Sequence, residues 1–383
     1  MNLYICNSII KKVKMKTKQF LVLLSILLCF SSMHSQILEG HVYDKKTNQP
    51  LQAATVYLDG TTIGGATDEN GYFKINGGGN TQSALVLSYM GYLTLRIDNP
   101  FQYKNIKTFM EEDSFSLDEV FIGKSMFSRK SMLKAFREQF LGMSQAGLSC
   151  KIENEDDINL FFDEKTNTLS ATSRIPLKII NNRLGYEVFF ELADFSVEYK
   201  QPKLGGEFVK KSSYAGTTFY KDISEKSSKT EQRRLDSYLG SSSHFMRTVA
   251  SESWEKEKFK LYLDKFPVNP KQYFKVQDTL GVKKVTLIKE PTGKFPIYKQ
   301  NTQIDLNNPE GEIAGYEDKK INFGILYDNK RQSAADFLEK EFIVDENGNY
   351  APVYAVMFGG HIGFQKLGDL LPLDYYQTVK GLY

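Results

Sequence analysis

The sequence predicts a mainly β protein in two parts, an N-terminal β-sandwich and a larger, strand-rich α+β domain. Three observations lead to this prediction. Short runs of alternating apolar and polar residues recur between turn-forming Gly, Asn, Asp and Pro residues. The chain of 383 residues contains 27 Phe and 22 Tyr, and aromatic residues favour strands. Segments with helical spacing are few and lie in the second part of the chain.

Residues 1–35 have the pattern of a signal peptide. Five lysines lie between positions 11 and 18 and precede an apolar run at residues 20–30. This run is shorter than the roughly 20 residues that a membrane-spanning helix needs, but it suits a secretion signal. We expect cleavage after Ser35, translation from Met1 or Met15, and export to the periplasm or outer membrane. No transmembrane helix is expected in the mature chain.

Removal of this segment changes both the charge and the cysteine count. The formal charge of the whole chain is +3, and the first 35 residues hold five Lys and no acidic residue, so the mature chain carries +3 − 5 = −2. No basic surface remains to indicate a nucleic-acid partner. Cys6 and Cys29 are removed, and Cys150 is left without a disulfide partner. We expect Cys150 to pack as a small apolar residue.

Residues 36–123 are predicted to form the sandwich. Leu38, Gly40 and Val42 alternate with polar or aromatic residues, which indicates a strand with one buried face. Asp59-Gly60 and Asn70-Gly71 are turn dipeptides. Residues 99–119 are predicted to be a transition without a strand. Further strands are expected at residues 54–58, 72–75, 84–89, 93–97 and 119–122.

Several motifs of this stretch are those of a known family. They are residues 40–44 (GHVYD), 50–51, 54–56, 64–67, 68–73 (DENGYF), 87–92 (LSYMGY) and 117–120 (LDEV). With them the stretch resembles the carboxypeptidase-regulatory-like domain, a transthyretin-like sandwich of Bacteroidota envelope proteins. The resemblance implies the fold and an envelope location, but no activity. In TonB-dependent transporters a similar sandwich precedes a plug and a barrel, so we expect this shorter chain to act alone or beside a partner.

Residues 124–383 are predicted to form the larger domain. A helix is expected to begin near residue 125 and to stop at Gly142. In the strand at residues 184–199, Tyr186 and Phe190 share one face and Glu187 lies on the other, and residues 207–220 are expected to pair with it. Residues 226–250 have helical spacing, which disfavours a transmembrane β-barrel. Further strands are expected at residues 150–162, 169–180, 273–277, 284–288, 321–327 and 354–358, a hairpin turn at 345–348, and a short helix at 364–371.

This second part also resembles other proteins. Its motifs at residues 140–144, 150–155, 182–186, 240–245 and 369–375 are similar to those of Bacteroidota proteins with the same two-part layout. Those proteins have no assigned activity, so the resemblance implies architecture and location only.

The sequence contains no recognisable catalytic, cofactor or metal set. Apart from His34 in the predicted signal peptide, the histidines are His41, His244 and His361, and none lies in an H-E-x-x-H pattern of a zinc peptidase. Ser131 and Lys134 spell S-x-x-K without the companion K-T-G motif. Residues 123–125 (GKS) lack the first glycine of a P-loop, and neither Asp-Glu-Asn-Gly turn has the final Glu of a calcium loop.

Two clusters remain to be weighed. The acidic pairs at residues 111–113 and 156–157 are expected to be solvated faces. The Ser-rich run at residues 240–245 (GSSSHF) places serines beside His244, but we expect it to serve helix capping and packing.

Our expectation is therefore a non-enzymatic exported envelope protein with a binding or scaffolding role, associated with outer-membrane machinery. Its partner would be an envelope protein or a glycan. The alternative is a hydrolase acting on glycan or peptidoglycan with two carboxyl groups about 5–10 Å apart.

Overall fold

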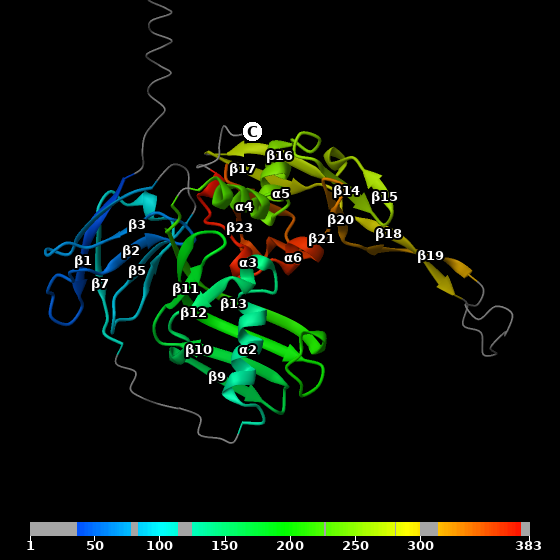
Figure 1. The fold of residues 1–383 in the computed structure, drawn as a ribbon. Helices are drawn as coiled ribbons and strands as arrows, with labels where there is room; N and C mark the ends of the chain where they lie inside the picture. The colour runs from blue at the N-terminus through cyan, green and yellow to red at the C-terminus, as the bar shows by residue number, and fades with distance from the viewer. Residues whose placement is uncertain are drawn as a thin grey trace, which may run out of the picture.

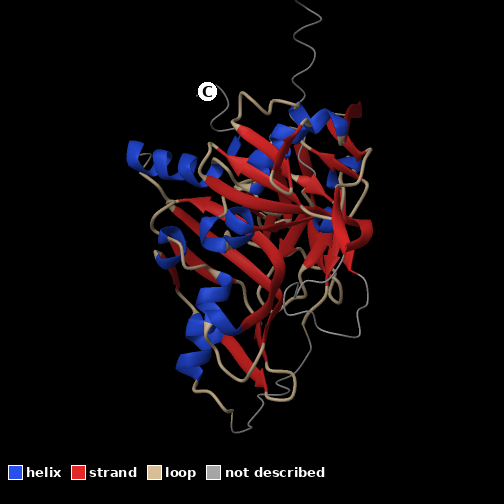
Figure 2. Cartoon of the chain, turned by 90° about the vertical axis from the view of Figure 1, so that its right-hand side faces the viewer, coloured by secondary structure: helices blue, strands red, loops and turns tan. Residues whose placement is uncertain are grey.

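Strands are the predominant secondary structure of the described residues (Figures 1 and 2). The computed structural model describes residues 37–77, 83–113, 125–225, 227–279, 281–298 and 313–376. A small pair of sheets at the N-terminus is followed by a larger strand-rich region with a few helices, which confirms the predicted fold class. The buried apolar side chains form three large separate cores, one in the N-terminal unit and two in the larger region. The predicted signal peptide and the strand at residues 119–122 lie outside the described residues.

The N-terminal unit is a sandwich of two sheets, and its predicted strands up to residue 97 are confirmed. In β1, Leu38 and Val42 are buried in the core while Glu39 and His41 are not, as the period of two predicted. One sheet contains β4 (Tyr72–Asn76), β1 (Ile37–Asp44) and β7 (Ile106–Met110), and the other contains β3 (Gly64–Ala66), β2 (Thr55–Leu58), β5 (Leu85–Ser88) and β6 (Leu95–Ile97).

The strand β7 corrects the expectation that residues 99–119 are a transition. It pairs with β1 in parallel, with Gly40 opposite Ile106 and Asp44 opposite Met110. The two backbones approach so closely that a Cβ on Gly40 would lie 2.0 Å from the Ile106 carbonyl oxygen. Glycine at this position is therefore a requirement of the pairing.

The middle unit is a six-stranded sheet with the helix α2 (Arg129–Phe140) across one face (Figure 1). Ser128 caps the helix by accepting a hydrogen bond from the Ser131 backbone N–H, and Gly142, with φ +93°, follows its end as predicted. Phe136 and Phe140 are fully buried against the sheet. The strands are β8 (Cys150–Ile152), β11 (Leu177–Asn181), β12 (Tyr186–Tyr199), β10 (Thr168–Ser173) and β9 (Ile158–Asp163), with β13 (Val209–Asp222) paired to β12.

The predicted pairing of the two long strands β12 and β13 is confirmed. The strands expected at residues 150–162 and 169–180 are each interrupted and form two strands instead. Glu187, predicted on the face opposite Tyr186, is buried and lies between two lysines, with its carboxylate 3.0 Å from Lys178 Nζ and 3.6 Å from Lys221 Nζ.

The C-terminal unit packs the helix α5 (Ser242–Ser251) against its sheets. The helical segment predicted at residues 226–250 is two helices, because Gly240, with φ +77°, separates α4 (Ser228–Tyr238) from α5. One sheet contains β15 (Phe266–Val268), β14 (Phe259–Leu263), β20 (Phe323–Tyr327), β21 (Arg331–Phe337) and β24 (Val356–Gly359). The other contains β16 (Phe274–Thr279), β17 (Val282–Leu287), β22 (Glu341–Val344) and β23 (Tyr350–Ala351), and the predicted hairpin at residues 345–348 joins its last two strands.

A two-stranded ribbon of β18 (Thr292–Tyr298) and β19 (Ile313–Lys320) projects from this unit (Figure 1). No helix within the described ranges has both the length and the apolar character to cross a bilayer.

The last described residues, 365–376, form a strap that returns to the other two units. The short helix predicted at residues 364–371 is in fact two turns, α6 (Gly360–Phe364) and the 3-10 turn Leu367–Asp369. Leu367 enters the core of the middle unit, and the Asn181 side chain donates a hydrogen bond to the Gly368 carbonyl at 2.9 Å. Further along, the Thr62 backbone N–H donates to the Asp374 carboxylate at 3.0 Å. The strap thereby contacts both units.

Candidate functional site

The loop after β2 holds the N-terminal unit against the rest of the molecule. The Gly60 N–H donates to the Thr218 carbonyl at 2.7 Å, and the Thr218 N–H donates to the Asp59 carboxylate at 2.8 Å. The Leu373 N–H of the strap donates to the Gly60 carbonyl at 2.7 Å. Gly60 has φ +77°, and a Cβ there would lie 2.6 Å from the Leu373 side chain. The Asp59-Gly60 turn predicted from the sequence is therefore also a point of contact between units.

A cavity of about 380 Å³ lies at this junction. All three units and the strap contribute to its wall, so it exists only when they are assembled. A cavity of this size with a few convergent polar groups is the usual form of a small-molecule site. Its lining includes Asp59, Gly60, Gly216, Thr218, Tyr220, Tyr238, Ser241, Ser242, Ser243, Asn347, Asn349, Asp369, Leu371, Leu373, Tyr375 and Tyr376.

Two asparagines on the turn between β22 and β23 give this wall unused hydrogen-bond acceptors. Asn347 is 6% exposed, and its side-chain oxygen has no hydrogen-bond partner in the described structure. The Asn349 oxygen is likewise without a partner, while its Nδ2 donates to the Asp345 carboxylate at 2.9 Å and to the Leu373 carbonyl at 3.2 Å. Both oxygens are closed off from solvent in this structure, so each side chain must rotate before a ligand in the cavity can donate to it. Such a bond would remove the cost of about 1–3 kcal/mol that a buried unpaired acceptor carries.

Tyrosines form part of the apolar wall, beside leucine, proline and valine side chains. Tyr220 and Tyr238 are 3% and 4% exposed, and burial raises the pKa of both hydroxyls, which stay protonated at neutral pH. The Tyr238 ring lies 5.8 Å from the Tyr375 ring and 6.1 Å from the Tyr376 ring, measured between centroids. These rings present flat apolar faces together with hydroxyl groups.

A charged network behind the wall fixes two of these tyrosines. The Arg247 guanidinium donates to the Tyr238 hydroxyl at 2.7 Å, donates to the Tyr376 hydroxyl at 3.3 Å and lies 4.3 Å from the Tyr376 ring centroid. Arg247 is held in turn by the Glu257 carboxylate at 3.1 Å. The hydrogen bond from His244 lowers the pKa of Glu257 to about 2, with Arg247 contributing, so this carboxylate is ionised.

His244 has no ring nitrogen left for acid–base chemistry. Its Nδ1 accepts the Gly240 backbone N–H at 3.0 Å, so the proton of the neutral ring lies on Nε2, which donates to Glu257 at 3.0 Å. Burial lowers the pKa of His244, which favours this neutral form. Ser241 is the N-cap of α5 and accepts the His244 backbone N–H. The run at residues 240–245 therefore lines the cavity with its serines, but the structure does not pair a serine with the histidine.

The other residues singled out in the sequence lie away from this cavity. His41 is on β1, where its ring packs between Tyr43 and Tyr72. Ser131 and Lys134 are exposed on α2, and the latter pairs with Glu138 at 3.8 Å. The acidic residues at 156–157 are exposed, and Glu111 pairs with Lys45 at 2.7 Å.

Cysteine and metal chemistry are not evident in the described part of the chain. Cys150 packs against the core of the middle unit, its Sγ donates to the Ala146 carbonyl at 3.3 Å, and burial raises the pKa of its thiol to about 12. At neutral pH this thiol is protonated and a poor nucleophile. The described residues contain no group of three His, Cys, Asp or Glu side chains arranged to hold a metal ion.

Comparison with known proteins concerns the N-terminal unit. Residues 38–122 match the profile of the CarboxypepD_reg-like domain. The N-terminal unit is a carboxypeptidase-regulatory-like domain. A stretch of 105 residues is 35% identical to part of a protein of Formosa agariphila described as TonB-dependent receptor P26, which covers 27% of this chain and 10% of that protein. The match thus spans about a tenth of the relative, and it confirms the resemblance expected from the GHVYD and DENGYF motifs.

Most of the cavity was not foreseen from the sequence. The run at residues 240–245 was noted, and its three serines do line the wall. Asn347 was predicted only as part of the turn at residues 345–348, Tyr375 only as part of a motif, and Asn349 was not singled out. Because these residues meet Thr218 and Gly60 across large separations in the chain, their assembly leaves no local pattern.

Proposed function

We propose that the protein is an exported cell-envelope protein that binds a small, hydroxyl-rich ligand of the glycan class in the junction cavity, without catalysis. The observation that carries this proposal is the pair of buried, unpartnered amide oxygens of Asn347 and Asn349 in a tyrosine-lined wall. Sugar hydroxyl groups donate hydrogen bonds to such oxygens, and the apolar faces of sugar rings pack on aromatic side chains.

Two features support a place in the envelope and near outer-membrane machinery. The sequence of residues 1–35 has the pattern of a secretion signal. The regulatory-like domain is similar to part of a protein described as a TonB-dependent receptor. We propose that this chain works beside such machinery, with the regulatory-like domain as one wall of its ligand site.

The carboxylates of the cavity favour binding over hydrolysis. Among the described residues that line it, the acidic ones are Asp59 and Asp369. Asp59 accepts the Thr218 N–H and pairs with Arg96 at 2.7 Å, while Asp369 accepts the Lys366 N–H at 3.2 Å. Both groups are engaged in holding the local structure, which is a poor arrangement for a general acid and base.

The test is a binding assay on the mature chain beginning at residue 36. Calorimetry with neutral hexoses, N-acetylhexosamines and their short oligomers should find a saturable ligand. Asn347→Ala should weaken its binding about tenfold, because one hydrogen bond to a buried acceptor contributes roughly 1 kcal/mol. Asn159→Ala is the matched control, since Asn159 is exposed on β9.

Chromatography of the recovered ligand distinguishes binding from turnover. Intact ligand supports the proposal, and cleavage products would replace it with the hydrolase alternative. An absence of saturable binding across the panel, or equal affinity in the Asn347 and Asn159 variants, would show that the cavity is not the ligand site.

A further inference from the structure

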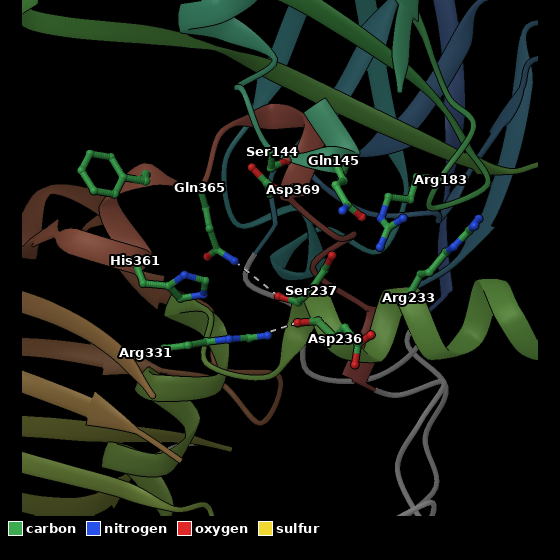
Figure 3. Close-up of a pocket in the computed structure, with 12 residues that line it drawn as sticks. Ser144, Gln145, Arg183, Arg233, Asp236, Ser237, Arg331, His361, Gln365 and Asp369 are labelled. Atoms are coloured by element: carbon green, nitrogen blue, oxygen red, sulfur yellow. Dashed lines mark hydrogen bonds between the residues drawn. The ribbon is translucent and has the colours of Figure 1, made fainter. Parts of the chain in front are cut away.

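A second cavity, of about 240 Å³, adjoins the first and has a different chemical character (Figure 3). The two share Ser237, Gln365 and Asp369 in their walls. Three arginines line the second cavity, and they come from distant parts of the chain: Arg183 from the turn before β12, Arg233 from α4 and Arg331 from β21. Figure 3 shows Arg183 and Arg233 on one side of the space, and Arg331 with His361 on the other.

Two of these arginines have unused donors. Within the described residues, neither the Arg183 guanidinium nor the Arg233 guanidinium forms a hydrogen bond or an ion pair. The neighbouring Arg234 behaves differently: its guanidinium donates to both Asp222 oxygens at 2.9 Å and to the Leu184 carbonyl at 2.7 Å. Arg234 is therefore paired within the protein and holds α4 in place, whereas Arg183 and Arg233 can donate hydrogen bonds to a ligand in the cavity.

Arg331 is fixed in position on the opposite side. Its Nη1 donates to the Asp236 carbonyl at 3.2 Å and to the Leu239 carbonyl. These acceptors are neutral backbone groups, so the full positive charge remains. Beside it, His361 Nε2 is shielded from solvent and has no partner in the described structure. The Gln365 side chain donates to the Ser237 carbonyl at 3.4 Å.

The carboxylates of the same cavity do not pair with these arginines. Asp236 accepts a hydrogen bond from Gln232 at 3.0 Å, and Asp369 accepts the Lys366 backbone N–H at 3.2 Å. Three arginines and two aspartates leave a formal charge of +1 around a small space. Guanidinium groups match the geometry of carboxylate and phosphate oxygens and bind them through paired hydrogen bonds.

We infer that this cavity binds an oxyanion group, a carboxylate or a phosphate, between Arg183, Arg233 and Arg331. The volume suits one such group with a small substituent. The inference does not require the junction cavity to hold a ligand, because the arginines belong to the second cavity alone.

Calorimetry on the mature chain tests it with three probes: inorganic phosphate, glucuronate and glucose. Saturable binding of phosphate alone assigns a phosphate site, and binding of glucuronate that the arginine variants weaken assigns a carboxylate site. Glucose reports any binding of the neutral sugar in the junction cavity, which the arginine variants should leave unchanged. Arg183→Gln and Arg233→Gln should each weaken anion binding about tenfold or more. Arg174→Gln removes the same charge from an exposed loop of the middle unit and should leave affinity unchanged.

Two results would overturn the inference: no saturable binding of either anion, or an equal loss in the Arg174 variant, which would indicate unspecific attraction to positive charge. Folding is checked by thermal melting, and the Arg183 and Arg233 variants should melt like the wild type because neither side chain holds a described partner.

Histidine titration by NMR gives a second readout. Burial and the charge of Arg331 lower the pKa of His361, with Asp369 acting in the opposite direction. A bound anion should raise this pKa measurably in the wild type and not in Arg183→Gln, and His361→Gln identifies the signal. Asn347→Ala should leave anion binding intact, so failure of this inference and failure of the proposed glycan site are separable.

Discussion

At the scale of single residues, the network of His244, Glu257 and Arg247 both stabilises the fold and positions side chains of the cavity wall. The Glu257 carboxylate accepts a hydrogen bond from His244 and pairs with Arg247, and both partners are largely buried. Removing one member of such a group leaves a buried charge of the others without its opposite charge. The network therefore acts as one unit, and damage to it should reach the cavity through Tyr238 and Tyr376.

We predict that Glu257→Gln lowers the free energy of unfolding by about 3 kcal/mol at pH 7, because Arg247 loses its counter-charge. Glu255→Gln, an exposed change in the same turn, should be close to neutral. Urea denaturation of both variants measures the difference. Equal stability of the two variants would contradict a structural role for the network.

The same network predicts how stability depends on pH. The pKa of Glu257 is about 2 in the folded protein, below its usual 4.5, so its contribution is present above pH 4.5 and is lost as the pH falls toward 2. The pKa of His244 is also lowered, because this histidine is buried in its neutral form. The free energy of unfolding therefore also falls as the pH drops below about 6.5, where the unfolded chain takes up a proton that the folded protein does not. Wild-type stability should fall through both ranges, and Glu257→Gln should remove the more acidic component in urea titrations at several pH values.

Two identical tetrapeptides show what a sequence can and cannot predict at this scale. In both Asp-Glu-Asn-Gly turns the aspartate oxygen accepts two backbone N–H groups, those of Asn70 and Tyr72 for Asp68 and those of Asn347 and Asn349 for Asp345. The turns were therefore predictable from local chemistry. Their surroundings were not, because Asp68 is exposed and Asp345 is 2% exposed.

At the scale of elements, the pairing of β1 with β7 depends on Gly40. The Ile106–Met110 segment has a buried–exposed alternation, but it is short and its partner lies more than 60 residues away, so the sequence alone did not separate it from a loop. The long strands β12 and β13 were predicted because many alternating residues agree. Length alone did not decide the outcome, because the shorter strands β2, β5 and β6 were predicted correctly while β7 was not.

We predict that Gly40→Ala lowers the free energy of unfolding of the regulatory-like domain by about 1–3 kcal/mol, because its Cβ would collide with the Ile106 carbonyl. Gly65→Ala is the control, since a Cβ on this residue of β3 meets nothing within 4 Å. Thermal melting of both variants tests the effect. A Gly40 variant as stable as the Gly65 variant would show that the two strands separate at little cost.

At the scale of the whole molecule, the strap links the three units by hydrogen bonds and packing contacts. Asp374 accepts hydrogen bonds from the backbone and the side chain of Thr62, and these contacts hold the strap to the regulatory-like domain. Neither cavity could be predicted from the sequence, because each is formed by segments that only the assembled units bring together. The fold class was predictable because it depends on local patterns.

We predict that Asp374→Ala lowers the free energy of opening the junction by about 1 kcal/mol. The effect is no larger because the contacts are partly exposed. Hydrogen exchange at the Gly60 and Leu373 amides should then be about five times faster, because both are bonded across the junction. Asp278→Ala, which removes an exposed partner of Lys283 from the C-terminal unit, should leave these amides unchanged. Unchanged exchange in the Asp374 variant would show that the strap is held by other contacts.

The parallel arrangement of β1 and β7 also has a mechanical consequence. The chain enters the regulatory-like domain at Ile37 and leaves β7 at Met110, at opposite ends of two neighbouring parallel strands. A force that pulls these two points apart slides one strand along the other, so that it loads all the hydrogen bonds between them at once and does not open them one at a time. The domain is therefore built to transmit tension along its own length.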